Sequence, residues 1–200
     1  MEQLGAIVLC GGMSRRMGRP KEWLTIGGET FVGRVVRLAS TRASIVVVSA
    51  APGQDLPPLP PGVEVVRDPV PDLGPLRGIA SGLGALVGRV EWAFAAAADA
   101  PMLEPRWIDR LRELASVEFD LVLPHVDGRE HPLAALYRPE AAAPAALALL
   151  DSGASRLGLL PRSLRTRVVV AEELAGVDPR FQTLRNVNRP EDYDALLGPS

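Results

Sequence analysis

Glycines and basic side chains gather directly after a short apolar stretch near the start of the chain. Residues 9–21 read Leu-Cys-Gly-Gly-Met-Ser-Arg-Arg-Met-Gly-Arg-Pro-Lys. Glycines let backbone N–H groups approach a ligand closely, and arginine and lysine side chains match the negative charge of phosphates. The apolar residues 6–9 predict a buried strand that ends at this loop. The segment therefore predicts a polyphosphate-binding loop at the carboxyl end of a first strand.

Lys21 is the only lysine of the chain, which has 21 arginines. All the remaining lysine-or-arginine positions hold arginine. A lysine at position 21 therefore favours a role that needs a compact ammonium group rather than a guanidinium. The spacing excludes two common phosphate-binding motifs. Neither the P-loop pattern nor the dinucleotide pattern Gly-x-Gly-x-x-Gly occurs in residues 9–21.

Two carboxylates follow predicted strands. Asp99 comes after the apolar stretch 92–98, and Asp68 comes after the stretch 63–67. Ligands of open parallel sheets bind outside the carboxyl ends of the strands, and Mg²⁺ is usually held by one or two carboxylates together with phosphate oxygens. The pattern therefore favours a magnesium–nucleotide site. An aspartate in a turn before proline fits the same sequence, above all at Asp68, so this alternative stays open.

The composition predicts a single domain over residues 1–200. The chain has 200 residues, of which 47% are hydrophobic, enough for a substantial core. A net charge of −2 and a pI of about 5.8 give no electrostatic footprint for nucleic acid. One cysteine cannot form an internal disulfide, and neither a signal peptide nor an apolar run of membrane-spanning length is evident. We therefore expect a cytoplasmic protein without nucleic-acid or membrane partners.

Strand and helix patterns alternate along the chain and predict an α/β fold with a mainly parallel sheet. The expected strands cover 6–9, 44–49, 63–67, 92–98, 121–124, 133–137 and 166–171. The expected helices cover 30–40, 79–87, 105–115, 140–150 and 191–197, with Thr30 as an N-cap and Pro144 interrupting or delaying the fourth. Residues 51–62 predict a surface loop, and Asp127-Gly128 predicts a hairpin turn.

Residues 9–21 resemble the signature of the molybdenum cofactor guanylyltransferases, which is Leu-Ala-Gly-Gly, three variable positions, Arg-Met-Gly and then Lys. That family belongs to the Rossmann-like nucleotidyltransferases, so the resemblance implies a three-layer fold with helices on both faces of a mainly parallel sheet. Cys10 stands where Ala is usual. The short ending Gly-Arg-Pro-Lys at 18–21 is more typical of the cytidylyltransferases of the same pathway.

The resemblance implies the groups that would act on the phosphates. Asp99 would hold Mg²⁺, and Lys21, together with Arg15 or Arg16, would offset the negative charge that builds on the leaving pyrophosphate. These four residues are the predicted catalytic set, and Asp99 is the predicted metal ligand.

Residues 74–78 read Gly-Pro-Leu-Arg-Gly and resemble the Gly-Pro-Leu-Ala-Gly segment of the family. The residues that would contact the nucleotide lie in the first loop, at strand ends and in this segment. They are Leu9, Cys10, Gly11, Gly12, Lys21, Ser49, Asp68, Gly74 and Asp99. A glycine at position 11 leaves room for the guanine amino group, and cytidylyltransferases more often have Ala there. Ser49 stands where guanylyltransferases commonly have Asn, and its hydroxyl has a shorter reach and lacks the amide.

Three further residues would lie on the acceptor side of the site. His131 begins a stretch that resembles His-Pro-x-x-Ala-Leu of the family, although a lone histidine is more often structural. Asn186 and Asn188, the only asparagines, lie in a stretch that resembles Asn-Val-Asn-Thr-Pro-Glu. Asn188 with Glu191 also fits a helix capping box, so Asn186 is the better candidate for the site.

The resemblance implies transfer of GMP from GTP to molybdenum-bound molybdopterin, with release of pyrophosphate. It also implies transient contacts with proteins that supply molybdopterin or mature molybdoenzymes. Two alternatives stay open: a cytidylyltransferase that uses CTP, favoured by residues 18–21 and Ser49, and a non-catalytic GTP-binding adaptor. An adaptor would be expected to lose the metal carboxylate or the loop lysine, whereas Asp99 and Lys21 are both present.

Overall fold

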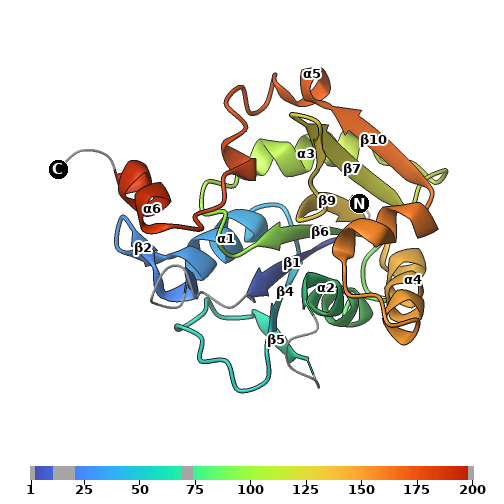
Figure 1. Cartoon of the computed structure of the whole chain (residues 1–200), viewed down its shortest axis with the longest axis horizontal. Helices are drawn as coiled ribbons and strands as arrows, with labels where there is room; N and C mark the ends of the chain where they lie inside the picture. The colour runs from blue at the N-terminus through green and yellow to red at the C-terminus, as the bar shows by residue number, and fades with distance from the viewer. Residues whose placement is uncertain (1–2, 11–20, 69–73, 198–200) are drawn as a thin grey trace.

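A computed structural model describes residues 3–10, 21–68 and 74–197. Within them, eight strands form one sheet in the order β10-β7-β9-β6-β1-β4-β5, with β8 paired to β7 (Figure 1). The strands of this sheet are β1 (Leu4–Cys10), β4 (Ile45–Ala50), β5 (Glu64–Arg67), β6 (Trp92–Ala97), β7 (Leu121–Val126), β8 (Arg129–Glu130), β9 (Ala134–Tyr137) and β10 (Thr166–Val170). β1 is parallel to β4 and β6, β5 is parallel to β4, and β10 is parallel to β7. The antiparallel pairs of this sheet are those of β9 with β6 and β7 and of the short β8 with β7, so the prediction of a mainly parallel sheet is confirmed.

Helices cover both faces of the sheet (Figure 1). They are α1 (Phe31–Ser40), α2 (Gly74–Gly84), α3 (Pro105–Glu113), α4 (Pro139–Asp151), α5 (Ala171–Leu174) and α6 (Pro190–Leu197). Successive residues of β1 point to opposite faces: Ala6 and Val8 join the core under α1 and α3, and Ile7 and Leu9 join the core under α2 and α4. This arrangement confirms the predicted three layers. None of the helices in the described part of the chain is long and apolar enough to cross a membrane.

Two local predictions are confirmed by backbone geometry. Thr30 caps α1, because its side-chain hydroxyl accepts a hydrogen bond from the Gly33 N–H at 3.2 Å. Asp127 and Gly128 have φ angles of 51° and 71°, and they connect β7 to the short antiparallel β8. Positive φ at both central residues is the geometry of a tight hairpin turn.

The helices α2 and α4 differ from the prediction in physically informative ways. α2 begins at Gly74 rather than at residue 79, because Pro75 fits the first turn of a helix and Gly78 packs closely against Leu9 and Ser49 of the sheet. α4 runs without interruption from Pro139 to Asp151, with Pro144 inside it. The Pro144 ring lies on the exposed side of the helix, where water can solvate the carbonyl group that loses its partner.

Gly82 provides a direct test of how tightly α2 packs on the sheet. A Cβ atom at this position would lie 2.5 Å from Cγ2 of Ile7, a buried β1 side chain. Gly82→Ala should therefore lower the free energy of unfolding by about 1–3 kcal/mol, measured by urea denaturation. Gly84→Ala is the matched control, because nothing lies within 4 Å of its added Cβ. Equal stability of the two variants would contradict this packing.

The C-terminal part of the chain returns to the region that follows the glycine-rich loop. Val187 packs with Leu24 and Phe31, and the Tyr193 hydroxyl donates to the carbonyl of Thr25 at 2.7 Å, across 168 positions. Thr25 belongs to a two-stranded hairpin of β2 (Thr25–Ile26) and β3 (Glu29–Thr30), beside which α6 lies in Figure 1. The first and last thirds thus share a core. The single-domain organisation over 1–200 stays a prediction.

Candidate active site

Lys21 and Asp99, predicted as the loop cation and the metal ligand, are in direct contact. The Lys21 ammonium donates to Oδ2 of Asp99 at 2.9 Å and to Oδ1 of Asn188 at 2.6 Å. The side chains of Lys21 and Asp99 are 20% and 19% exposed, so the pair is reachable from solvent. Three segments that are far apart in the sequence therefore meet at one ammonium group, and the fold brings together three predicted site residues.

A cavity of about 230 Å³ lies beside this ion pair, outside the carboxyl ends of β1 and β6. It is lined by Leu9, Cys10, Lys21, Glu22, Pro75, Ala97, Ala98, Asp99, Leu133 and Asn186. The two strands are parallel with Leu9 opposite Ala97, so their ends are level and both open into the cavity. This is where ligands of open parallel sheets bind, as the sequence predicted.

Val187 explains how both asparagines reach the site. Its N–H donates to the carbonyl of Asp99 at 2.8 Å, and its side chain is 4% exposed in the core with Leu24. With Val187 anchored, the residue on each side of it lies next to the cavity wall. Asn188 accepts from Lys21, and Asn186 lines the cavity.

The predicted capping box of Asn188 with Glu191 is wrong. α6 begins at Pro190, which takes the first helical position, so the third position falls on Asp192 rather than on Glu191. One carboxylate oxygen of Asp192 accepts from the backbone N–H groups of Asn188 and Arg189, each at 2.9 Å. These hydrogen bonds lower the pKa of Asp192. Asn188 is consequently not needed as a cap, and its amide oxygen contacts Lys21.

A second cavity of about 830 Å³ adjoins the first, and Asn186 lines both. His131 and Arg156 also line it, together with residues of β8 and of the 3₁₀ helix η2 (Leu157–Ser163). The Nε2 atom of His131 lies 3.3 Å from the carbonyl oxygen of Val126, and partial burial lowers the pKa of His131 below its usual value. The imidazole is therefore neutral at physiological pH.

Gly74 lines this second cavity at the start of α2. Its φ angle is +72°, and an added Cβ would lie 3.2 Å from the carbonyl oxygen of Ser155. A left-handed backbone and a close carbonyl group both disfavour a side chain, so glycine keeps the cavity wall open here. The structure places Gly74 on the side of His131, whereas the sequence predicted a contact with the nucleotide, and that contact stays a prediction.

Ser49 and Asp68 do not line either cavity. Ser49, the second-to-last residue of β4, is 2% exposed, and its hydroxyl has no hydrogen-bond partner among the described residues. The Asp68 carboxylate accepts a short hydrogen bond from the hydroxyl of Ser81 on α2. Their predicted nucleotide contacts remain predictions. Four other predicted residues, Gly11, Gly12, Arg15 and Arg16, lie outside the described residues.

Glu22 is a site residue that the sequence analysis did not identify. It is 9% exposed and lines the smaller cavity next to Lys21. Burial raises the pKa of the Cys10 thiol strongly, and the charges of Glu22 and Asp99 raise it further, so the thiol stays protonated. No sequence signal marks Glu22, because the side chain that binds it, Gln54, lies 32 positions away in an irregular loop.

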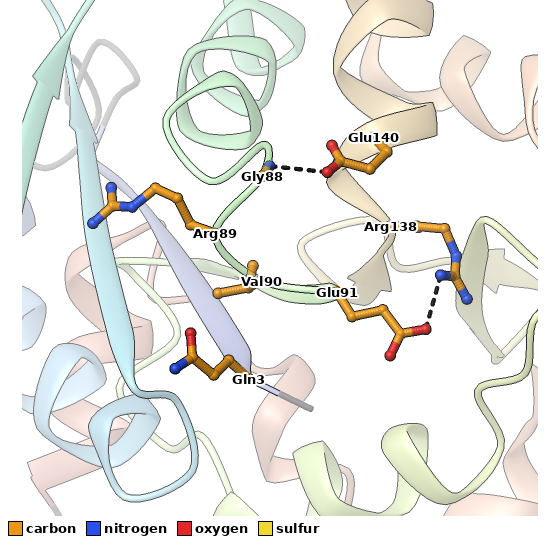
Figure 2. A pocket seen from close by; sticks show the side chains of 7 residues that line it. All are labelled: Gln3, Gly88, Arg89, Val90, Glu91, Arg138 and Glu140. Carbon is orange, nitrogen blue, oxygen red and sulfur yellow. Dashed lines mark hydrogen bonds and ion pairs between the residues drawn. The ribbon is translucent and has the colours of Figure 1, made fainter. Parts of the chain in front are cut away.

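A third hollow, of about 420 Å³, lies at the opposite end of the sheet, before β1 and β6 (Figure 2). Its charged side chains already have partners. Arg138 donates to Glu91 at 2.8 Å, Glu140 accepts from the Gly88 N–H at 2.9 Å, and Arg89 pairs with Glu64. Paired charges leave little to attract a phosphate, so the two cavities at the carboxyl ends remain the candidate active site.

Comparison with known proteins agrees with this geometry. A family model described as the MobA-like NTP transferase domain matches residues 6–166. The chain belongs to the MobA-like NTP transferase family. It is therefore a nucleotidyltransferase by family, as its first loop predicted.

Curated relatives match over almost the whole chain. The protein named probable molybdenum cofactor guanylyltransferase in Mycobacterium tuberculosis H37Rv is 38% identical over 200 residues, which cover 98% of this chain and 94% of that protein. The protein of the same name in Mycobacterium avium is 38% identical over 198 residues, covering 97% and 95%.

Solved structures share the fold. Molybdopterin-guanine dinucleotide biosynthesis protein A from Archaeoglobus fulgidus superposes with a TM-score of 0.78 at 22% identity, over 96% of each chain. The 2-C-methyl-D-erythritol 4-phosphate cytidylyltransferase from Thermus thermophilus gives 0.69 at 18% identity, covering 98% and 97%. These similarities confirm the Rossmann-like α/β fold.

Proposed function

We propose that this protein transfers GMP from GTP to the terminal phosphate of molybdenum-bound molybdopterin, forming the guanine dinucleotide cofactor and pyrophosphate. The observation that carries the proposal is the meeting of Lys21, Asp99 and Asn188 between two adjoining cavities. The names of the curated relatives point to the same reaction. One cavity would take the triphosphate and the other the acceptor.

The reaction needs little covalent chemistry from side chains. An acceptor phosphate oxygen attacks the α-phosphorus of GTP in line with the departing pyrophosphate, so a P–O bond forms as another breaks. The protein contributes by holding the two substrates in register and by offsetting negative charge. Asn186 lines both cavities, so its amide can orient groups on either side of the reacting phosphorus.

Asp99 fits a role as the ligand of Mg²⁺. Its carboxylate is reachable from solvent and lies beside the smaller cavity. Among the described residues no group of three or more His, Cys, Asp or Glu could hold a metal by itself. A single carboxylate such as that of Asp99 suits Mg²⁺, which binds through one or two carboxylates and takes its remaining oxygen ligands from phosphates and water. When bound, the ion would supply positive charge to the phosphates.

Lys21 would change partners when the nucleotide binds. In the structure its ammonium pairs with Asp99 and Asn188. A triphosphate in the cavity offers oxygens of higher charge, and a flexible four-carbon side chain can turn toward them. The pair thus keeps both groups of the site in place before substrate arrives.

We place the reaction in the cytoplasm and include transient contacts with proteins that deliver molybdopterin or receive the product.

Calorimetric titration with GTP and with CTP, each with Mg²⁺, tests the choice of base. We expect GTP to bind at least tenfold more tightly, which corresponds to about 1.4 kcal/mol. The reason is the glycine predicted beside the guanine amino group at position 11. A preference for CTP would contradict the guanylyl assignment but would still fit a nucleotidyltransferase. Ser49 would then be the residue to test for a role in the choice of base. Absence of binding by either nucleotide would contradict the proposed site.

A further inference from the structure

Glu22 is an unusual residue to find beside the candidate active site. The residue is 9% exposed, and among the described residues no lysine, arginine or histidine forms an ion pair with its carboxylate. Burying a carboxylate costs free energy unless hydrogen bonds compensate. Within the described part of the chain, Nε2 of Gln54, a residue of the loop that follows β4, donates a 2.7 Å hydrogen bond to this carboxylate. This hydrogen bond ties the short segment that contains Glu22 to the loop after β4.

Gln54 is itself fixed from two directions. Its Oε1 accepts from the N–H of Ala51 at 2.9 Å, which folds the side chain back onto its own loop. Arg67, the last residue of β5, donates to the carbonyls of Ala51 and Gln54 at 3.2 and 2.9 Å. The amide group that binds Glu22 is therefore braced by the ends of two parallel strands, which are rigid parts of the fold.

The segment that needs this support is the 3₁₀ helix η1 (Lys21–Trp23). A single 3₁₀ turn has little stability of its own, so its position depends on tertiary contacts. On one side, Leu24 is buried with Phe31 and Val187. On the other side, Glu22 binds Gln54 and the Trp23 indole N–H donates to the Asp55 carbonyl at 3.3 Å. Lys21 begins this turn and reaches Asp99 from it.

We propose that Glu22 and Gln54 form a clamp that positions Lys21 for its role at the phosphates. The clamp ties η1 to the carboxyl end of β4, and it thereby fixes where the Lys21 side chain starts. Glu22 and Gln54 act through Lys21 rather than on the substrate. The proposal extends the proposed function and rests on it for the catalytic role of Lys21, whereas the placement of Lys21 can be tested without activity.

Exchanging the two side chains gives a rescue experiment. Gln54→Glu places two carboxylates at hydrogen-bond distance, so their repulsion opens the clamp. Adding Glu22→Gln to that variant restores the pair in reverse, because the new amide at position 22 can donate to the new carboxylate at position 54. The second oxygen of that carboxylate can still accept from the Ala51 N–H, as Gln54 does. Glu22→Gln alone should be mild, since its amide oxygen can accept from Gln54.

We expect Gln54→Glu to lower kcat for pyrophosphate release by on the order of 10- to 100-fold, with a smaller change in KM for GTP, because a misplaced catalytic group slows the chemical step. The double exchange should recover most of this loss. In a Lys21→Ala background, Gln54→Glu should cause no further loss of kcat, since the effects of two substitutions that act through the same group do not add. Gln3→Glu is the matched control, because it makes the same change at the opposite end of the sheet (Figure 2).

A second readout does not depend on catalysis. Lys21 is the only lysine, so modification by an amine-reactive ester, followed by peptide mass spectrometry, reports its environment alone. Gln54→Glu should raise the rate of Lys21 modification several-fold by loosening its contact with Asp99, and the double exchange should restore the slow rate. An unchanged rate, a failed rescue or an additive loss in the Lys21→Ala background would overturn the clamp. A changed rate in a protein that transfers no GMP would retain the clamp and refute the proposed function.

Discussion

Replacing Asp99 by asparagine should reduce the rate of pyrophosphate release by on the order of 100- to 1,000-fold, the loss expected when one preorganised charge-stabilising group is removed. The change keeps the size of the side chain but removes the charge that would bind Mg²⁺ and that now pairs with Lys21 at 2.9 Å. Initial rates with GTP, Mg²⁺ and molybdenum-bound molybdopterin measure the effect. The variant should also bind Mn²⁺ in the presence of GTP more weakly, as measured by electron paramagnetic resonance.

Asp109→Asn is the matched control for this variant. Asp109 lies on α3 and forms an ion pair with Arg42 at 2.7 Å, with side chains that are 43% and 35% exposed. Such a surface pair contributes about 0–1 kcal/mol to stability and lies outside both cavities. Its removal should leave the turnover unchanged. An Asp99→Asn protein that is folded and retains full activity would show that the metal assignment is wrong.

Replacing Lys21 by alanine should lower kcat by about 100-fold or more, because charge on the departing pyrophosphate would no longer be offset. Lys21→Arg should restore little activity. The two acceptors at 2.9 and 2.6 Å converge on a single nitrogen, whereas a guanidinium presents its donors as a planar fork. Arg42→Ala, which removes an exposed cation elsewhere, should leave kcat unchanged. Full activity of either Lys21 variant would contradict the role proposed for this ammonium.

Bound nucleotide should also protect Lys21 from chemical modification. The amine-reactive ester used for the clamp reports this residue directly, because the chain has no other lysine. With GTP and Mg²⁺ present, phosphate oxygens would surround the ammonium and the modification rate should fall. A rate that does not respond to saturating GTP would place the triphosphate away from Lys21.

The sequence predicted the parts of the site that depend on strand ends. Asp99 follows a stretch of apolar residues that predicted a buried strand, and parallel strands bring their carboxyl ends to one edge of a sheet. Lys21 was identifiable because it is the single exception to the use of arginine. The alternation of strand and helix patterns was likewise sufficient to predict an α/β fold with a mainly parallel sheet, whereas the three layers were implied by the family resemblance.

Other features depended on contacts between distant residues and could not be predicted. The capping role assigned to Asn188 failed because Pro190 moves the start of α6 by one residue, which transfers the reciprocal contact to Asp192. The start of α2 was placed five residues late, because glycine suggests a loop unless the neighbouring strand shows why a side chain would not fit. The contact between Glu22 and Gln54 joins a short turn to an irregular loop, and neither has a periodic pattern.

Identifying the product by mass spectrometry tests the proposed transfer of GMP most sharply. The protein would be incubated with molybdenum-bound molybdopterin, Mg²⁺ and an equimolar mixture of GTP and CTP. We expect the guanine dinucleotide form to accumulate with an equal amount of pyrophosphate. Accumulation of the cytosine form would contradict the guanylyl assignment. The absence of any dinucleotide, from a folded protein that binds GTP, would contradict the transferase and favour a nucleotide-binding adaptor.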